Sequence, residues 1–140
     1  GPEMRGGKAR CTVIVSDEEI GAPLVRHPSA SIVLNIPSME AFEPEIKPGG
    51  VLVVNSSLVP QKSQRTDIRV FYVAASDMAT EMGNVRLANV ICLGALAKAT
   101  GVVSLEALEK ALDDHLPERH RRLLGLNKEA LHKGAALGSV

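Results

Sequence analysis

The stretch PGGVLVVNSS, residues 48–57, decides the fold class of this chain. It holds four consecutive apolar residues between a Pro-Gly-Gly turn and a run of small polar residues. A short apolar run of this kind, bounded by turn signals, is typical of a parallel strand that is buried on both faces. Apolar runs at residues 31–36 and 68–73 are predicted as further strands, with helical or irregular segments between them. Strands that alternate with such crossovers indicate an α/β domain with a mostly parallel sheet.

The first part of the chain adds one more strand and a short helix. Residues 9–16 alternate between apolar and mixed side chains, which predicts a strand that is partly covered on both faces. Pro37 begins a predicted helix that continues to about residue 45.

The second half of the chain is predicted to be helical. Residues 84–99 are apolar on nearly every side, which is typical of a buried helix, and we expect a partner to cover part of it. Gly94 inside this helix indicates close packing against a neighbour. Other predicted helices are 76–83, capped by Ser76-Asp77, 105–115, capped by Ser104, and 117–133, after which the chain is expected to fray. The predicted architecture is a three-layer α/β/α fold with Rossmann-like topology and C-terminal helices packed on the sheet.

Composition narrows the function classes. The chain has 140 residues, enough for one domain with a core, and its 16 basic and 16 acidic residues balance. This balance gives no argument for binding nucleic acid or a membrane surface, and no apolar run is long enough to span a bilayer. Cys11 and Cys92 lie in separate apolar runs, so we interpret them as buried thiols rather than ligands of a cluster or a zinc ion. A reducing, cytoplasmic setting is expected.

Two polar segments are candidate ligand-binding sites. Arg5, Gly6 and Gly7 lie in a Gly-rich turn whose backbone N–H groups could converge on an anion, with an ordinary surface turn as the alternative. Asn55 and Ser56 follow the strongest predicted strand, and ligands of open α/β sheets bind outside the carboxyl ends of strands. We therefore predict that the turn lies near Asn55 or Ser56; a hydrogen-bonded loop end is the alternative for this segment.

Other polar residues carry weaker signals. The four histidines have no matching nucleophile or carboxylate nearby in sequence and are interpreted as exposed side chains. The cluster from Arg119 to Arg122 is interpreted as a solvated helix face, with contact to an acidic partner or a phosphate as the alternative. Arg86, at the start of an apolar helix, is predicted to tie that helix to a loop or to face another subunit.

Motifs in a fixed order along the chain resemble one protein family. They are GPEMRGG at 1–7, IGAP at 20–23, PGGVLVVNSS at 48–57, RTDI at 65–68, GNVRLAN at 83–89 with LGA at 93–95, and NKEAL at 127–131. Together they resemble the gamma subunit, or gamma domain, of 2-oxoacid:ferredoxin oxidoreductases over nearly the whole chain. Members of that family carry a strand, a Gly-rich loop and a helix before the first motif. The chain is therefore expected to be a single gamma-type domain, residues 1–140, without this N-terminal Gly-rich βα unit. Without that unit a cleft is expected beside residues 51–54, to be filled in the complete protein by sequence upstream of residue 1 or by another chain.

The resemblance implies a function in a complex. The complex would oxidatively decarboxylate a 2-oxoacid, 2-oxoglutarate or pyruvate, with coenzyme A, giving acyl-CoA, carbon dioxide and reduced ferredoxin. Thiamine diphosphate and iron–sulfur clusters would be held mainly by other subunits, so no catalytic residue or metal ligand is expected in this chain. The gamma subunit would contribute near the coenzyme A site, which makes Arg5, Gly6, Gly7, Asn55 and Ser56 the candidate cofactor-binding residues.

The implied partners are alpha, beta and ferredoxin-like delta subunits and ferredoxin itself, with no nucleic acid and no membrane. In isolation the chain is expected to be inactive, and a homodimer is one open alternative. Two other functions are also compatible with the sequence. One is a non-catalytic scaffold subunit that contacts no ligand, and the other is a subunit of the indolepyruvate oxidoreductase type.

Overall fold

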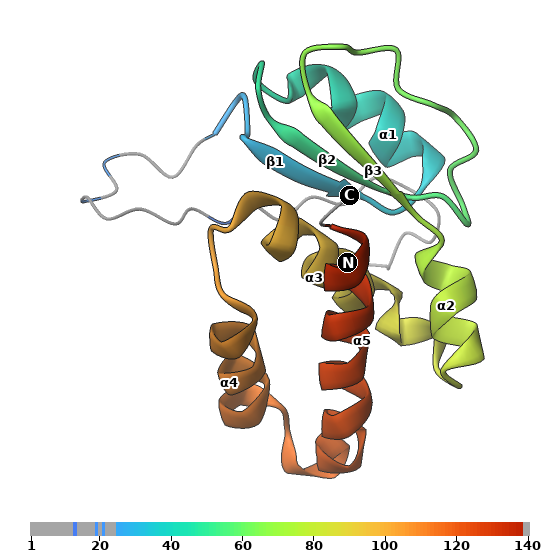
Figure 1. Ribbon diagram of the computed structural model, residues 1–140, viewed down its shortest axis with the longest axis vertical. Coiled ribbons are helices and arrows are strands. Elements are labelled where there is room, and N and C mark those ends of the chain that lie inside the picture. The colour runs from blue at the N-terminus through green and yellow to red at the C-terminus, as the bar shows by residue number, and fades with distance from the viewer. Residues whose placement is uncertain (1–12, 14–18, 20, 22–24, 139–140) are drawn as a thin grey trace, which may run out of the picture.

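The computed structural model describes residues 13, 19, 21 and 25–138, and for residues 119 and 120 the backbone alone (Figure 1). Three parallel strands form a sheet in the order β1-β2-β3. The strands are β1 (Ala30–Val33), β2 (Val51–Asn55) and β3 (Arg69–Val73). The α-helices are α1 (Ile36–Phe42), α2 (Ala75–Glu81), α3 (Ala88–Thr100), α4 (Leu105–His115) and α5 (Leu124–Leu137), and the 3-10 helices are η1 (Glu43–Glu45), η2 (Val85–Leu87) and η3 (Glu118–Leu123). The predicted strand at residues 9–16 lies outside the described residues.

Strand β2 is the centre of the described sheet. Val54 pairs with Val33 of β1 on one side and with Tyr72 of β3 on the other. Every residue of β2 is buried. Because β2 has a hydrogen-bonded neighbour on each side, the expected cleft beside residues 51–54 is wrong.

Alternate residues of β2 serve two separate cores, one on each face of the sheet. Leu52 and Val54 pack with Val33, Met39 and Ile46 on the face that α1 covers. Residues of the opposite parity, Val51 and Val53, pack on the other face with apolar residues of α2, α3 and α5. Figure 1 shows α1 on one side of the sheet and α3 with α5 on the other. The predicted three-layer α/β/α arrangement is therefore confirmed.

Helix α1 begins where the sequence places a proline after a strand. The side chain of Asn35 accepts a hydrogen bond from the Ser38 N–H at 2.9 Å and so caps the helix. Pro37 occupies the first turn, where its missing N–H costs nothing. The helix then tightens into η1, so the prediction of a helix to about residue 45 is confirmed.

Helix α3 is the most deeply buried described helix, with five buried residues against four in α5. It begins at Ala88, because the residues before it form η2. Glycines let α3 and α5 approach closely: a Cβ on Gly94 would lie 2.1 Å from the Leu131 carbonyl oxygen, and one on Gly134 would lie 1.8 Å from that of Ile91. The close packing predicted for Gly94 is confirmed. The prediction that the chain frays from Gly134 is wrong, because α5 continues to Leu137.

Of the C-terminal helices, α5 packs on the sheet as predicted, whereas α4 packs on other helices. Ser104 caps it as predicted, accepting a hydrogen bond from the Ala107 N–H. The helix packs against α5 and α3 and has no fully buried residue. Helix α5 reaches the core on the sheet through Ala130 and Leu126, next to Ile91, Cys92 and Ala95 of α3. Among the described residues no helix combines the length and apolar character needed to cross a membrane.

Candidate functional site

The loop after β2 is organised by one buried amide. Asn55 is 1% exposed, at the carboxyl end of β2. Its Oδ1 accepts hydrogen bonds from the N–H groups of Ala75 and Ser76 at 3.1 and 3.3 Å, and its Nδ2 donates to Ser76 Oγ at 3.0 Å. An amide buried without partners would cost free energy, and here both ends of the amide are satisfied. Asn55 therefore joins the end of β2 to the start of α2.

The two serines after Asn55 have different surroundings. Ser57 Oγ accepts a hydrogen bond from the Asp77 N–H at 3.1 Å. The Ser56 N–H donates to the Val73 carbonyl at 2.8 Å, while the Ser56 hydroxyl forms no hydrogen bond within the described part of the chain. Ser56 is half-buried, and Leu58 beside it is 54% exposed. Ser56 is therefore the member of this loop whose side chain is available to a ligand.

The cap of α2 comes from this loop rather than from the start of the helix itself. The residue before the helix, Ala74, makes no capping bond, so the prediction that Ser76-Asp77 caps the helix is wrong. Asn55 and Ser57 supply the acceptors instead, from about 20 residues earlier in the chain. The N–H groups of Ala75, Ser76 and Asp77 are thus already occupied and do not form a free anion site.

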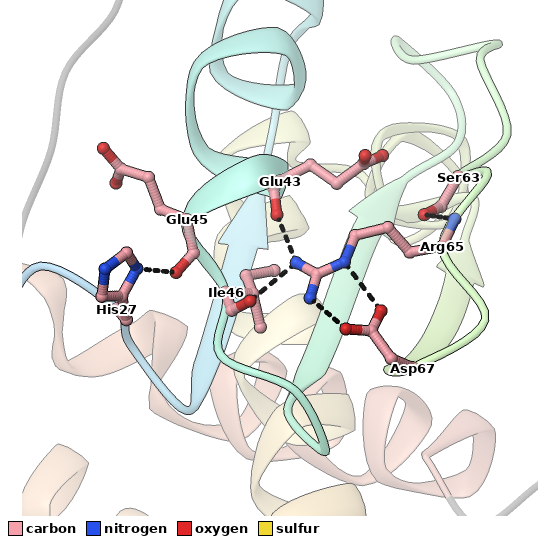
Figure 2. Close-up of polar contacts among 7 residues, drawn as sticks. All are labelled: His27, Glu43, Glu45, Ile46, Ser63, Arg65 and Asp67. Carbon is pink, nitrogen blue, oxygen red and sulfur yellow. Dashed lines mark hydrogen bonds and ion pairs between the residues drawn. The ribbon is translucent and has the colours of Figure 1, made fainter.

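A second polar cluster lies at the opposite, amino end of the strands (Figure 2). Arg65 donates from Nε and Nη2 to the two carboxylate oxygens of Asp67, at 2.9 and 2.7 Å. Its Nη1 donates to the carbonyl oxygens of Glu43 and Ile46, at 2.9 and 2.7 Å. His27 Nδ1 donates to the neighbouring carbonyl of Glu45 at 3.1 Å. One guanidinium therefore fastens the loop before β3 to the end of η1.

Arg65 and Asp67 each stabilise the charged form of the other. The hydrogen bonds from Arg65 hold the pKa of the Asp67 carboxyl below its usual range, and the same contact raises the pKa of Arg65. The Asp67 carbonyl also accepts a hydrogen bond from the Gly49 N–H at 2.7 Å, which links the starts of β3 and β2. The cluster is a structural clamp. The sequence offered Arg65 and Asp67 as part of the RTDI motif, but it gave no sign of the distant carbonyl groups that Arg65 binds.

The structure brings together only part of the predicted site. Arg5, Gly6 and Gly7 lie outside the described residues, so their proximity to Asn55 or Ser56 stays a prediction. Arg86 is exposed and its side chain binds no loop within the described residues, so the first alternative predicted for it is wrong; that it faces another subunit stays a prediction. His132 lies beside Glu109, a carboxylate 23 residues earlier in the chain.

The described residues contain no group of three His, Cys, Asp or Glu side chains that could hold a metal ion. Cys92 is buried in the core between the sheet and α3, and burial raises the pKa of its thiol to about 12. Such a thiol stays protonated at neutral pH and is a poor nucleophile or metal ligand. The interpretation of Cys92 as a buried thiol is confirmed.

Comparison with known proteins identifies the family. Residues 1–137 match the family described as pyruvate ferredoxin/flavodoxin oxidoreductase. The chain is 34% identical over 132 residues to the 2-oxoglutarate synthase subunit KorC of Methanocaldococcus jannaschii, a match that covers 91% of this chain and 71% of that protein. It is 35% identical over 123 residues to KorC of Methanothermobacter marburgensis, covering 84% of this chain and 66% of that one. The chain thus spans about two thirds of the length of these relatives.

A solved structure supports the same assignment. The gamma subunit of a keto/oxoacid ferredoxin oxidoreductase from Geobacter sulfurreducens aligns with a TM-score of 0.73 and 28% identity, over 84% of this chain and 66% of that chain. Fold, motif order and relatives agree, and the resemblance noted in the sequence is confirmed. The chain belongs to the pyruvate ferredoxin/flavodoxin oxidoreductase family and is of the gamma-subunit type found in 2-oxoacid:ferredoxin oxidoreductases.

Proposed function

We propose that this chain acts in the oxidative decarboxylation of a 2-oxoacid with coenzyme A, giving acyl-CoA, carbon dioxide and reduced ferredoxin. The proposed substrate is 2-oxoglutarate rather than pyruvate, because the relatives reported above are subunits of 2-oxoglutarate synthase. The proposed partners are alpha, beta and ferredoxin-like delta subunits together with ferredoxin, in the cytoplasm.

The observation that carries a ligand-facing role is the construction of the loop after β2. Asn55 is fully used in holding the loop against α2, whereas the Ser56 hydroxyl is accessible and has no partner within the described residues. A rigid support beneath an available polar group is the arrangement that a binding site requires. We assign Ser56, together with Arg5, Gly6 and Gly7, to contact with coenzyme A, and Asn55 to positioning Ser56.

The chemistry of the reaction would come from groups outside this chain. Thiamine diphosphate, where bound, supplies carbanion stabilisation, and iron–sulfur clusters carry electrons to ferredoxin. The described residues do not fit either group, because they offer no cluster of ligating side chains and the Cys92 thiol is buried. The contribution of this chain would be to orient coenzyme A and to exclude water beside it.

Reconstitution tests the proposal. The chain alone should give no reduction of ferredoxin, whereas the complex with its alpha, beta and delta subunits should turn over 2-oxoglutarate faster than pyruvate. Replacing Ser56 or Arg5 by alanine in the complex should raise the KM for coenzyme A and leave thermal stability nearly unchanged. Turnover by the chain alone, or a complex that is inactive with every 2-oxoacid, would contradict the proposed activity.

A scaffold function is the second candidate, and one observation favours it. The first N–H groups of α2, the natural anion site at this edge of the sheet, are already bonded to Asn55 and Ser57. If the alanine variants of Arg5 and Ser56 leave the KM for coenzyme A unchanged in an active complex, the chain contributes structure only.

A further inference from the structure

Helix α4 is the least firmly attached α-helix in the described part of the chain. It packs against α5 and, less extensively, against α3, and none of its residues is fully buried. Every other described α-helix contributes at least two buried residues to the fold. Figure 1 shows α4 beside α5 and away from the sheet. Because burial of apolar side chains is the main source of stability, α4 should be held more weakly than its neighbours.

The apolar face of α4 does not close against α3 and α5. Leu108 and Leu112 of α4 are only half-buried, and Leu93 of α3 is 38% exposed. A groove of about 190 Å³ remains between the three helices. It is lined by Val90 and Leu93 of α3, by Leu131 of α5, and by the α4 residues Leu108, Leu112 and His115. Protein interiors are close-packed, so this groove shows that the apolar contact of α4 is incomplete.

Two ion pairs supplement this contact by tying α4 to α5. Lys128 Nζ lies 3.0 Å from Asp113 Oδ1, and His132 pairs with Glu109. Glu109 and Asp113 are four residues apart on α4, and Lys128 and His132 are four apart on α5, so the side chains of each helix share a face. We call this matched set the α4–α5 ladder. Its side chains are partly exposed, and ion pairs at such positions are weak and are screened by salt.

Both connections of α4 lie at the surface. Helix α3 ends at Gly101, which has a left-handed conformation with a φ of 67°, and Val102 after it is 53% exposed. At the other end α4 stops at Leu116, which is extended, and Pro117 follows and is exposed. Short surface segments of this kind are where hinges absorb changes in backbone direction. Helix α4 could therefore move without disturbing the sheet.

We propose that α4 is a hinged flap that opens and closes over the groove on α3 and α5, and that the α4–α5 ladder holds it shut. An open flap uncovers Val90, Leu93 and Leu131, so α4 controls access to this apolar surface. A helix of 11 residues is marginal in water, so α4 also loses its helical hydrogen bonds when it detaches. Salt favours the open state because it screens the ladder. The inference does not depend on the proposed function.

Native-state hydrogen exchange of the full chain, followed by NMR, tests the flap. Amides of α4 should exchange at least about a hundredfold faster than those of Ile91 and Ala95 in α3, and with a weaker dependence on urea, because the opening is local. Raising salt from about 0.02 to 0.5 M should speed exchange in α4 by about threefold and leave α3 unchanged. Equal protection and equal urea dependence in α4 and α3 would show that α4 opens only when the whole chain unfolds, which would overturn the inference.

Charge variants test the ladder. Asp113→Lys places a second cation opposite Lys128 and should speed exchange in α4 by about threefold or more in low salt, and added salt should then slow it. The matched control is Asp114→Lys, because Asp114 is exposed and forms no ion pair within the described residues. Its exchange in α4 should stay within about twofold of the wild type.

A charge swap completes the test. Asp113→Lys/Lys128→Asp restores an opposite-charge pair and should return exchange in α4 to within about twofold of the wild type. Circular dichroism establishes that each variant is folded, and the wild-type measurement decides the matter if one is not. If Asp113→Lys exchanges like Asp114→Lys, or if salt leaves α4 of the wild type unchanged, the ladder does not hold the flap and the inference is overturned.

Discussion

Replacing Gly134 by alanine should force helices α3 and α5 apart. The added Cβ would lie 1.8 Å from the carbonyl oxygen of Ile91 and 2.7 Å from its carbonyl carbon. Ordinary contact begins at about 3.4 Å, so the helices would have to separate locally by roughly 1.5 Å. The clashing atoms belong to a helix backbone, which cannot move aside as a flexible side chain can.

The expected loss of stability follows from two opposing effects. Overpacking of a close interface costs about 1–3 kcal/mol, and occasionally more. Alanine in a helix interior is favoured over glycine by about 1 kcal/mol. Because the clash involves backbone and α3 also carries Ile91 and Ala95 of the core, the overpacking cost should be at or above the top of its range. We expect a net loss of about 2 kcal/mol in the free energy of unfolding.

Urea denaturation followed by circular dichroism measures this loss. Gly125→Ala on the same helix is the matched control, because its added Cβ would meet no atom within 4 Å. That control should be stabilised by about 0.5–1 kcal/mol. If Gly134→Ala is as stable as the wild type, or gains stability like the control, then α3 and α5 do not pack through this glycine and the reasoning fails.

Three further predictions concern single side chains. Asn55→Ala should lose about 2–3 kcal/mol in urea denaturation, because Ala75 and Ser76 then lack an acceptor; a loss under about 0.5 kcal/mol would contradict the capping function. Cys92 should resist iodoacetamide in the folded protein and react only in denaturant, as mass spectrometry of its peptide would show, since burial raises its pKa to about 12. Asp67 stabilises the fold above its usual pKa near 3.8 and loses this contribution as pH falls through its lowered value. Thermal melts below about pH 4 should therefore drop more steeply for the wild type than for Asp67→Asn, and parallel curves would count against the clamp.

Much of the fold was accessible from local sequence patterns. The apolar run at residues 51–54 predicts a strand buried on both faces, and its alternate residues do serve two cores. Ser104 predicts the start of α4, and the predicted helix 105–115 has the observed bounds. These features depend on neighbouring residues alone, so sequence periodicity reports them directly.

The features that the sequence did not predict share a physical cause. Each of them depends on a contact with residues that are distant in sequence. Glycines near the end of a chain usually indicate a frayed segment, and the sequence around Gly134 and Gly138 was read in this way. In the structure both glycines pack against the backbone of α3. Asn55 was predicted as a ligand contact or a loop-end hydrogen bond, and only the position of α2 shows that its amide is already used. Arg65 binds carbonyl groups 19 and 22 residues earlier in the chain, and backbone groups leave no trace in a sequence pattern.

The connection between β2 and β3, residues 56–68, crosses the sheet without a helix and is fastened at each end, by Asn55 and by Arg65. Between these fastenings, Pro60 and Gln61 are exposed. Since doubling the length of a flexible loop costs only about 0.6 kcal/mol in closure entropy, added residues there should leave both fastenings intact. A short tag or fluorophore inserted between Pro60 and Gln61 would thus give a reporter for this chain within its complex that leaves the described sheet unaltered.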